Sequence, residues 1–116
     1  LSDAYRDFLK LVLTNPDLKP LSTTAAQDFT DEQRERQLVI FEMLISLFER
    51  AYLLAFEPDM SPRQLRRWHS WDDYMREWCQ REDFRALLPR LVQGEDPDFA
   101  AYIQRVAAEE AQRPPC

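Results

Sequence analysis

The chain has 116 residues, of which 45 % are hydrophobic and 31 % are charged, so we expect one globular domain rather than a disordered tail. Its single glycine, Gly94, excludes glycine-rich phosphate-binding loops and dinucleotide fingerprints, and it argues against a turn-rich β fold. The net charge of −6 would repel a phosphate backbone, so general nucleic-acid binding is not expected.

The first predicted helix begins at Ser2 and ends before Pro16, because the residue that precedes a proline avoids the helical conformation. Its apolar residues recur at helical spacing: Tyr5, Phe8, Leu9, Val12 and Leu13. Residues 14–28 form a connector that is unusually long for a compact domain. Either residues 23–28 form a short helix within it, or the first helix is a semi-independent arm.

The second predicted helix begins at a capping box, Thr30-Asp31-Glu32-Gln33, and runs to about Phe56. A narrow polar stripe follows one side of this helix: Glu35, Glu42, Ser46 and Glu49. Nearly every other residue from Leu38 to Phe56 is apolar. A helix that is apolar around most of its circumference is surrounded by neighbours, so we expect this one to be the central helix of the fold.

A second capping box, Ser61-Pro62-Arg63-Gln64, begins the third predicted helix. One side of that helix is apolar: Leu65, Trp68, Trp71, Met75, Trp78 and Cys79. The next apolar residues would lie roughly 160° away if the helix continued: Phe84, Leu87, Leu88 and Leu91. The chain should therefore break over residues 80–83, and a fourth helix should follow, kinked at Pro89 and capped by Gly94.

The segment Asp96-Pro97-Asp98 supplies a cap, a first-turn proline and an acidic first turn for a fifth helix. Together the patterns predict an all-α fold, a bundle of about five helices around a central hydrophobic helix at residues 30–56. We expect a single helical domain over residues 1–116, within which residues 1–29 could form an N-terminal arm and connector.

Three tryptophans and a tyrosine lie within eleven residues of the third helix: Trp68, Trp71, Tyr74 and Trp78. They could line an aromatic pocket for a ligand or partner, since large flat side chains dominate binding hot spots. The alternative, which we favour, is that they fill the core of a small domain. Trp71 and Tyr74 lie toward the edge of the apolar side and are the better candidates for exposure.

Arg63, Arg66 and Arg67 occupy the opening turns of the third helix. A helix N-terminus with three arginines is suited to an anion. The alternative, which we favour, is that they form ion pairs with acidic neighbours at Glu57, Asp59 or the polar stripe of the second helix. If this region binds a partner, the contact residues should be Arg63, Arg66, Arg67, Trp71 and Tyr74.

Other constellations give little support for catalysis. His69, the only histidine, can pair with Asp72 or Asp73 on the polar side of its helix, which is an ordinary surface arrangement. Glu42 and Glu49 could suggest a di-metal centre, but the sequence has no Glu-x-x-His motif, so pairing with arginines of other helices is expected instead. Cys79 should be buried and inert. We therefore expect no enzyme, no metal site and no cofactor.

Two cysteines, Cys79 and Cys116, are too few for a disulfide framework or a zinc site, which favours reduced thiols in a cytoplasmic setting. The sequence has neither a signal-peptide pattern nor an apolar run of membrane-spanning length. Residue 1 is leucine rather than methionine, which indicates a processed product or an excised piece.

Several segments in order are similar to one family: Phe48-Glu49-Arg50-Ala51-Tyr52-Leu53-Leu54, the three tryptophans, Phe84-Arg85, and Phe99-Ala100-Ala101-Tyr102-Ile103. Residues 30–106 thereby resemble uncharacterised bacterial proteins that carry a small helical domain downstream of one or two transmembrane helices. The resemblance implies a bacterial origin and a membrane anchor before Leu1. It supplies no catalytic residues.

The function that these observations favour is a non-enzymatic helical interaction or regulatory module, with a protein partner or self-association as its mode of action. It would be cytoplasmic, either as a free protein or as the cytoplasmic domain of a membrane-anchored one. The alternative is a small-molecule sensor or enzyme that uses an aromatic cavity lined by Trp68 and Trp78.

Overall fold

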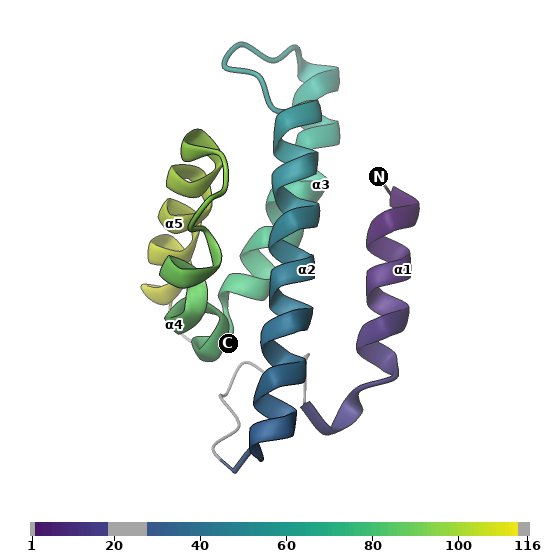
Figure 1. The fold of residues 1–116 in the computed structure, drawn as a ribbon. Coiled ribbons are helices and arrows are strands. Elements are labelled where there is room, and N and C mark those ends of the chain that lie inside the picture. Colours follow the sequence, from purple (N-terminus) through teal and green to yellow (C-terminus); the bar gives the residue numbers. More distant parts are fainter. Residues whose placement is uncertain (1, 19–27, 114–116) are drawn as a thin grey trace.

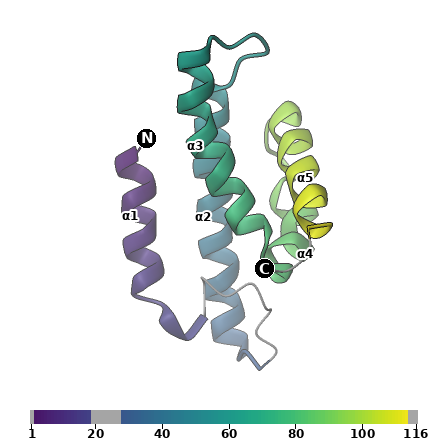
Figure 2. The ribbon, with the colours of Figure 1, turned by 180° about the vertical axis from the view of Figure 1, so that it is seen from behind.

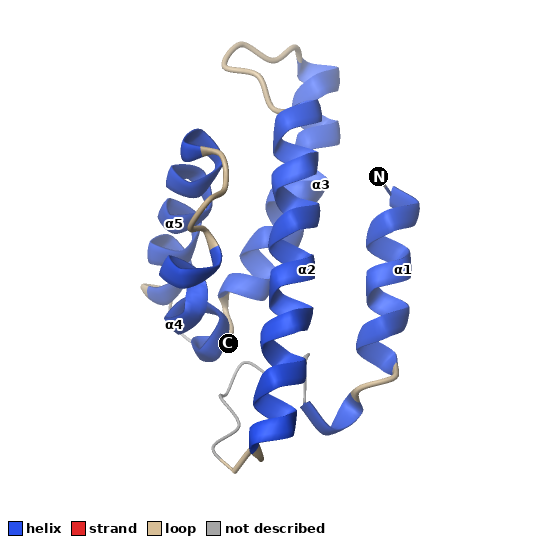
Figure 3. Cartoon of the chain, viewed as in Figure 1, coloured by secondary structure: helices blue, strands red, loops and turns tan. Residues whose placement is uncertain are grey.

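The computed structural model describes residues 2–18 and 28–113, and within these ranges it contains five α-helices, one short 3₁₀ helix and no β-strand (Figures 1 and 3). The elements in chain order are α1 (Ser2–Leu13), η1 (Pro16–Leu18), α2 (Asp31–Ala55), α3 (Pro62–Cys79), α4 (Glu82–Leu91) and α5 (Pro97–Ala111). The predicted all-α fold is confirmed.

The predicted helix starts at Thr30, Ser61 and Asp96 are confirmed by their capping hydrogen bonds. Thr30 Oγ1 accepts from the Gln33 amide at 3.1 Å, while the Gln33 side chain accepts from the Thr30 amide at 2.8 Å. Ser61 forms the same reciprocal pair with the residue three positions on, and the Asp96 carboxylate accepts from the Phe99 amide at 3.0 Å. Local sequence therefore determines where α2, α3 and α5 begin.

The predicted break between the third and fourth helices is also confirmed, since α3 ends at Cys79 and α4 begins at Glu82. The helix α4 continues past Pro89 to Leu91, and the residue that caps its C-terminus is Val92. The predicted cap, Gly94, lies two residues further along. It has a φ of +85°, in the left-handed region that a residue without Cβ adopts at no steric cost, so it shapes the turn into α5.

The long helix α2 is central, because it contacts each of the other four α-helices. The helix α1 runs antiparallel to it on one flank, α3 packs on the face seen from behind, and α4 and α5 cover the opposite flank (Figures 1 and 2). Leu44, Ile45 and Phe48 are fully buried at this junction. Apolar burial along α2 therefore holds the bundle together.

One part of the central-helix prediction is wrong for the described residues, which do not surround α2 on every side. Val39, Met43, Leu53 and Leu54 are 54 %, 49 %, 57 % and 70 % exposed. The four neighbouring helices cover one side of α2, and none of them lies over the face that carries these residues. The apolar residues around α2 thus led us to expect that other helices cover more of its surface than they do.

The helix α1 is joined to the rest of the fold through buried residues: Tyr5, Phe8 and Val12. The indole Nε1 of Trp78 donates to the Tyr5 hydroxyl at 3.1 Å, which links α1 to α3. Arg36 on α2 binds Asp17 of η1 through an N–O contact of 2.7 Å. The alternative of a short helix at residues 23–28 lies outside the described residues, apart from Asp28.

Candidate functional site

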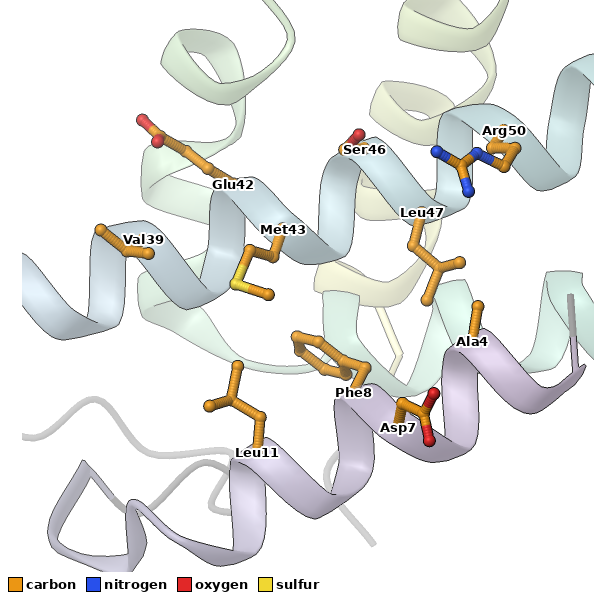
Figure 4. A pocket seen from close by; sticks show the side chains of 10 residues that line it. All are labelled: Ala4, Asp7, Phe8, Leu11, Val39, Glu42, Met43, Ser46, Leu47 and Arg50. Carbon is orange, nitrogen blue, oxygen red and sulfur yellow. The ribbon is translucent and has the colours of Figure 1, made fainter.

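A groove of about 580 Å³ lies between α1 and α2 (Figure 4). Its apolar lining comes from both helices: Ala4, Phe8, Leu11, Val39, Met43 and Leu47. Its polar residues are Asp7, Glu42, Ser46 and Arg50. We refer to it as the α1/α2 groove.

The groove forms because the apolar side of α1 faces the core of the bundle and does not pack across the exposed face of α2. Phe8 is buried on that edge, while Leu11 on the groove side is half-buried. On α2, Leu47 is buried and its neighbour Met43, one turn earlier, is half-exposed. The groove is therefore apolar at its floor and open to solvent above, as expected of a surface that receives another element.

Two opposite charges lie on α2 at the groove, and neither is neutralised within the described part of the chain. Glu42 and Arg50 are both exposed, and no described residue lies within 4.0 Å of either as an ion-pair partner. Eight residues separate them, or about 12 Å along the helix axis. Asp7 on the α1 side lies 3.9 Å from Lys10. The pairing of Glu42 with an arginine of another helix, which the sequence led us to expect, is wrong for the described residues.

Arg63, Arg66 and Arg67 are exposed in the first turns of α3. Their expected ion pairs with Glu57, Asp59 or Glu49 do not form. Glu49 instead accepts a hydrogen bond from the Asp96 amide at 2.6 Å, at the start of α5. Its carboxylate is thereby directed toward α5.

The two aromatic members of the predicted contact set, Trp71 and Tyr74, pack inward. Trp71 is only 7 % exposed and contacts Tyr5 and Phe48, with ring centroids 5.8 Å and 6.4 Å apart. Tyr74 is half-buried and stacks on Tyr5 at 4.1 Å. The predicted contact set therefore divides into three exposed arginines and two aromatic side chains held by α1.

Trp68 and Trp78 are buried, and neither lines the α1/α2 groove. Trp68 packs edge-on against Tyr52, Phe56 and Tyr102. Each of these two indoles also donates a hydrogen bond to a tyrosine hydroxyl. Trp68 Nε1 donates to Tyr102 at 3.0 Å, and Trp78 Nε1 donates to Tyr5 at 3.1 Å. These contacts are those of core residues. The aromatic cavity beside Trp68 or Trp78 stays a prediction.

A polar network between α3 and α5, which the sequence did not reveal, includes Asp72. Its carboxylate accepts from the Tyr102 hydroxyl and from Arg76 Nε, the latter at 2.8 Å. Arg76 also donates to the buried Glu110 at 3.1 Å. The pKa of Tyr102 is raised well above its ordinary value, mainly by burial and secondly by the hydrogen bond to Asp72. Asp72 thus faces inward, and the exposed His69 forms an ion pair with neither of its two predicted partners, Asp72 and Asp73.

A second carboxylate site joins Glu49 to Glu95, which follows α4. Burial raises the pKa of Glu95 to about 7, and hydrogen bonding and charge repulsion with Glu49 act in the same direction. Cys79 is buried as predicted, and burial raises the pKa of its thiol to about 12, which leaves almost no thiolate at neutral pH.

Within residues 2–18 and 28–113, no group of three or more His, Cys, Asp or Glu side chains is arranged to hold a metal ion. In the same ranges, no helix combines the length and apolarity that crossing a membrane requires.

Comparisons with protein-family models, curated proteins and solved structures found no match.

Proposed function

We propose that the chain is a non-enzymatic helical interaction module and that the α1/α2 groove is its contact surface. The observation that carries the proposal is the exposure of Val39 and Met43 beside an apolar floor. A second helix laid along the groove would remove these side chains from water, which is the usual geometry of helix-in-groove recognition.

This surface differs from the contact set that we expected from the sequence. Arg63, Arg66 and Arg67 have exposed charges but no adjoining apolar patch from Trp71 or Tyr74, whose rings pack on Tyr5. Exposed charges contribute mainly to association rate and specificity, whereas buried apolar area supplies most of the affinity. The groove is therefore the better-supported surface.

A cytoplasmic location is part of the proposal, either for a free protein or for the cytoplasmic domain of a membrane-anchored chain. The membrane-anchored version rests on the resemblance to bacterial proteins with an upstream transmembrane helix.

Site-specific photo-crosslinking tests the contact surface. A benzophenone amino acid placed at Val39 in the groove should give a discrete protein adduct in the native cells. The same amino acid at Gln104, on an exposed position of α5, is the matched control and should give none. Adding Met43→Asp should remove the adduct from position 39. An absence of adducts from position 39, or an equal yield from Gln104, would contradict the proposal.

A further inference from the structure

The exposed face of α2 has a regular order of side chains. Five exposed residues follow one another at spacings of three or four positions and so share one face of the helix: Val39, Glu42, Ser46, Arg50 and Leu53. We call this set the α2 ridge. It is about 21 Å long and runs beside the α1/α2 groove.

The α2 ridge is self-complementary under reversal about Ser46. Val39 and Leu53 are the apolar ends, each seven residues from Ser46. Glu42 and Arg50 lie four residues from Ser46 on either side and carry opposite charges. Reversing the helix therefore places an apolar residue on an apolar residue and an acid on a base. A small residue at the centre lets two helices approach closely.

We propose, on the basis of the function proposed above, that the occupant of this surface is a second copy of the chain. The two α2 helices would pack antiparallel, with a two-fold axis at Ser46. Glu42 of each copy would then lie beside Arg50 of the other, as an isologous interface requires. A parallel arrangement would instead place Glu42 on Glu42 and Arg50 on Arg50, so the charges select the antiparallel one.

The same rotation closes the groove. A two-fold axis perpendicular to α2 keeps both α1 helices on the same flank of the α2 pair, since α1 lies to one side of α2 (Figure 1). The two grooves then face each other, and Phe8, Leu11 and Met43 of each copy contribute to a single apolar interior. The four helices form an antiparallel bundle, in which exposed apolar surface on both copies becomes core.

Analytical ultracentrifugation of charge-reversal variants tests the proposal. The wild-type chain should show a concentration-dependent dimer. Arg50→Glu and Glu42→Arg should each weaken dimerisation at least about tenfold, because each creates two like-charge contacts and removes two attractive ones. The double variant Glu42→Arg/Arg50→Glu should restore the dimer. Arg66→Glu is the matched control, since it makes the same change of charge on α3, which packs on the other face of α2, and it should leave the dimer unchanged.

A wild-type chain that stays monomeric at every concentration, or a double variant that fails to regain the dimer, would overturn the proposal. All these positions are exposed, so we expect every variant to fold, and thermal unfolding checks that each one does. The mass of the adduct from position 39 separates this proposal from the broader one. Twice the chain mass supports the second copy, another protein overturns the second copy alone, and no adduct contradicts both.

Discussion

The Tyr102 hydroxyl donates to the carboxylate of Asp72, and this bond joins α5 to α3. The same hydroxyl accepts from the Trp68 indole at 3.0 Å, so one oxygen serves two buried partners. The arrangement gives the inward-facing Asp72 and the buried Trp68 their partners, and no buried side-chain nitrogen or oxygen in the described ranges is without one.

Tyr102→Phe should destabilise the fold by about 1–3 kcal/mol, because it leaves the Trp68 indole without its acceptor and removes one of the hydrogen bonds to the Asp72 carboxylate, which keeps its bond from Arg76. The matched control is Gln104→Ala, on the exposed side of the same helix, which should change the free energy of unfolding by less than about 0.5 kcal/mol. Urea denaturation followed by tryptophan fluorescence measures both. Equal stability of the two variants would show that the network contributes nothing.

The Glu49–Glu95 contact predicts a pH dependence of stability. The pKa of Glu95 is raised from its ordinary 4.5 to about 7 in the folded chain, so the folded state holds this proton more tightly than the unfolded state does. The contribution of this group is complete below about pH 4.5 and is lost as the pH rises through about 7. The melting temperature should therefore fall between about pH 5 and 8, and Glu95→Gln should remove most of that fall. An identical pH profile for Glu95→Gln would assign the dependence to other groups.

Two adjacent residues of α2 test which face of this helix is buried in the bundle and which face is exposed. Val39 is 54 % exposed and Ile40 is 6 % exposed. Val39→Asp should alter the free energy of unfolding by less than about 0.5 kcal/mol, whereas Ile40→Asp should cost several kcal/mol by placing a charge in the core. Chemical denaturation at a protein concentration at which the chain is monomeric compares them directly. Under that condition, a large loss from Val39→Asp would mean that this face of α2 is covered within a single chain.

Replacing an exposed arginine at the start of α3 should stabilise the fold, whereas most substitutions destabilise a protein. Arg63 is the second residue of α3 and forms no ion pair with a described residue. Arg63→Glu should therefore raise the stability by about 0.3–1 kcal/mol, because an acidic side chain in the first turn complements the helix dipole. A loss of stability, measured as a lower melting temperature at low salt, would assign Arg63 a structural contact.

The sequence was informative about elements because helix ends depend on local chemistry. The capping box at Thr30 and the acidic cap at Asp96 satisfy backbone amides within a single turn, so their effect can be derived from a few neighbouring residues. The break before α4 was equally accessible, since it follows from a change in the direction of the apolar face.

The coverage of α2 could not be derived in the same way, because it depends on where α1 packs. A signal was nevertheless present. Leu53 lies at the same angle around the helix as Glu35, inside the polar stripe, and Val39 lies about 20° beyond Ser46, at the edge of that stripe. Apolar residues within a polar stripe indicate a covered surface outside the chain's own core. The inward direction of Asp72 had no such signal, since it depends on Tyr102, thirty residues away.

Disulfide trapping tests the central claim, that the exposed face of α2 is a self-complementary contact surface, most directly. In a chain carrying Cys116→Ser, the variant Ser46→Cys should form a bridged dimer under mild oxidation, because the two-fold axis brings these positions together and a disulfide needs Cα atoms within about 7 Å. Glu35→Cys, exposed on the same side of α2 but eleven residues from Ser46, should stay monomeric. Failure of Ser46→Cys to bridge, or equal bridging by Glu35→Cys, would contradict the account.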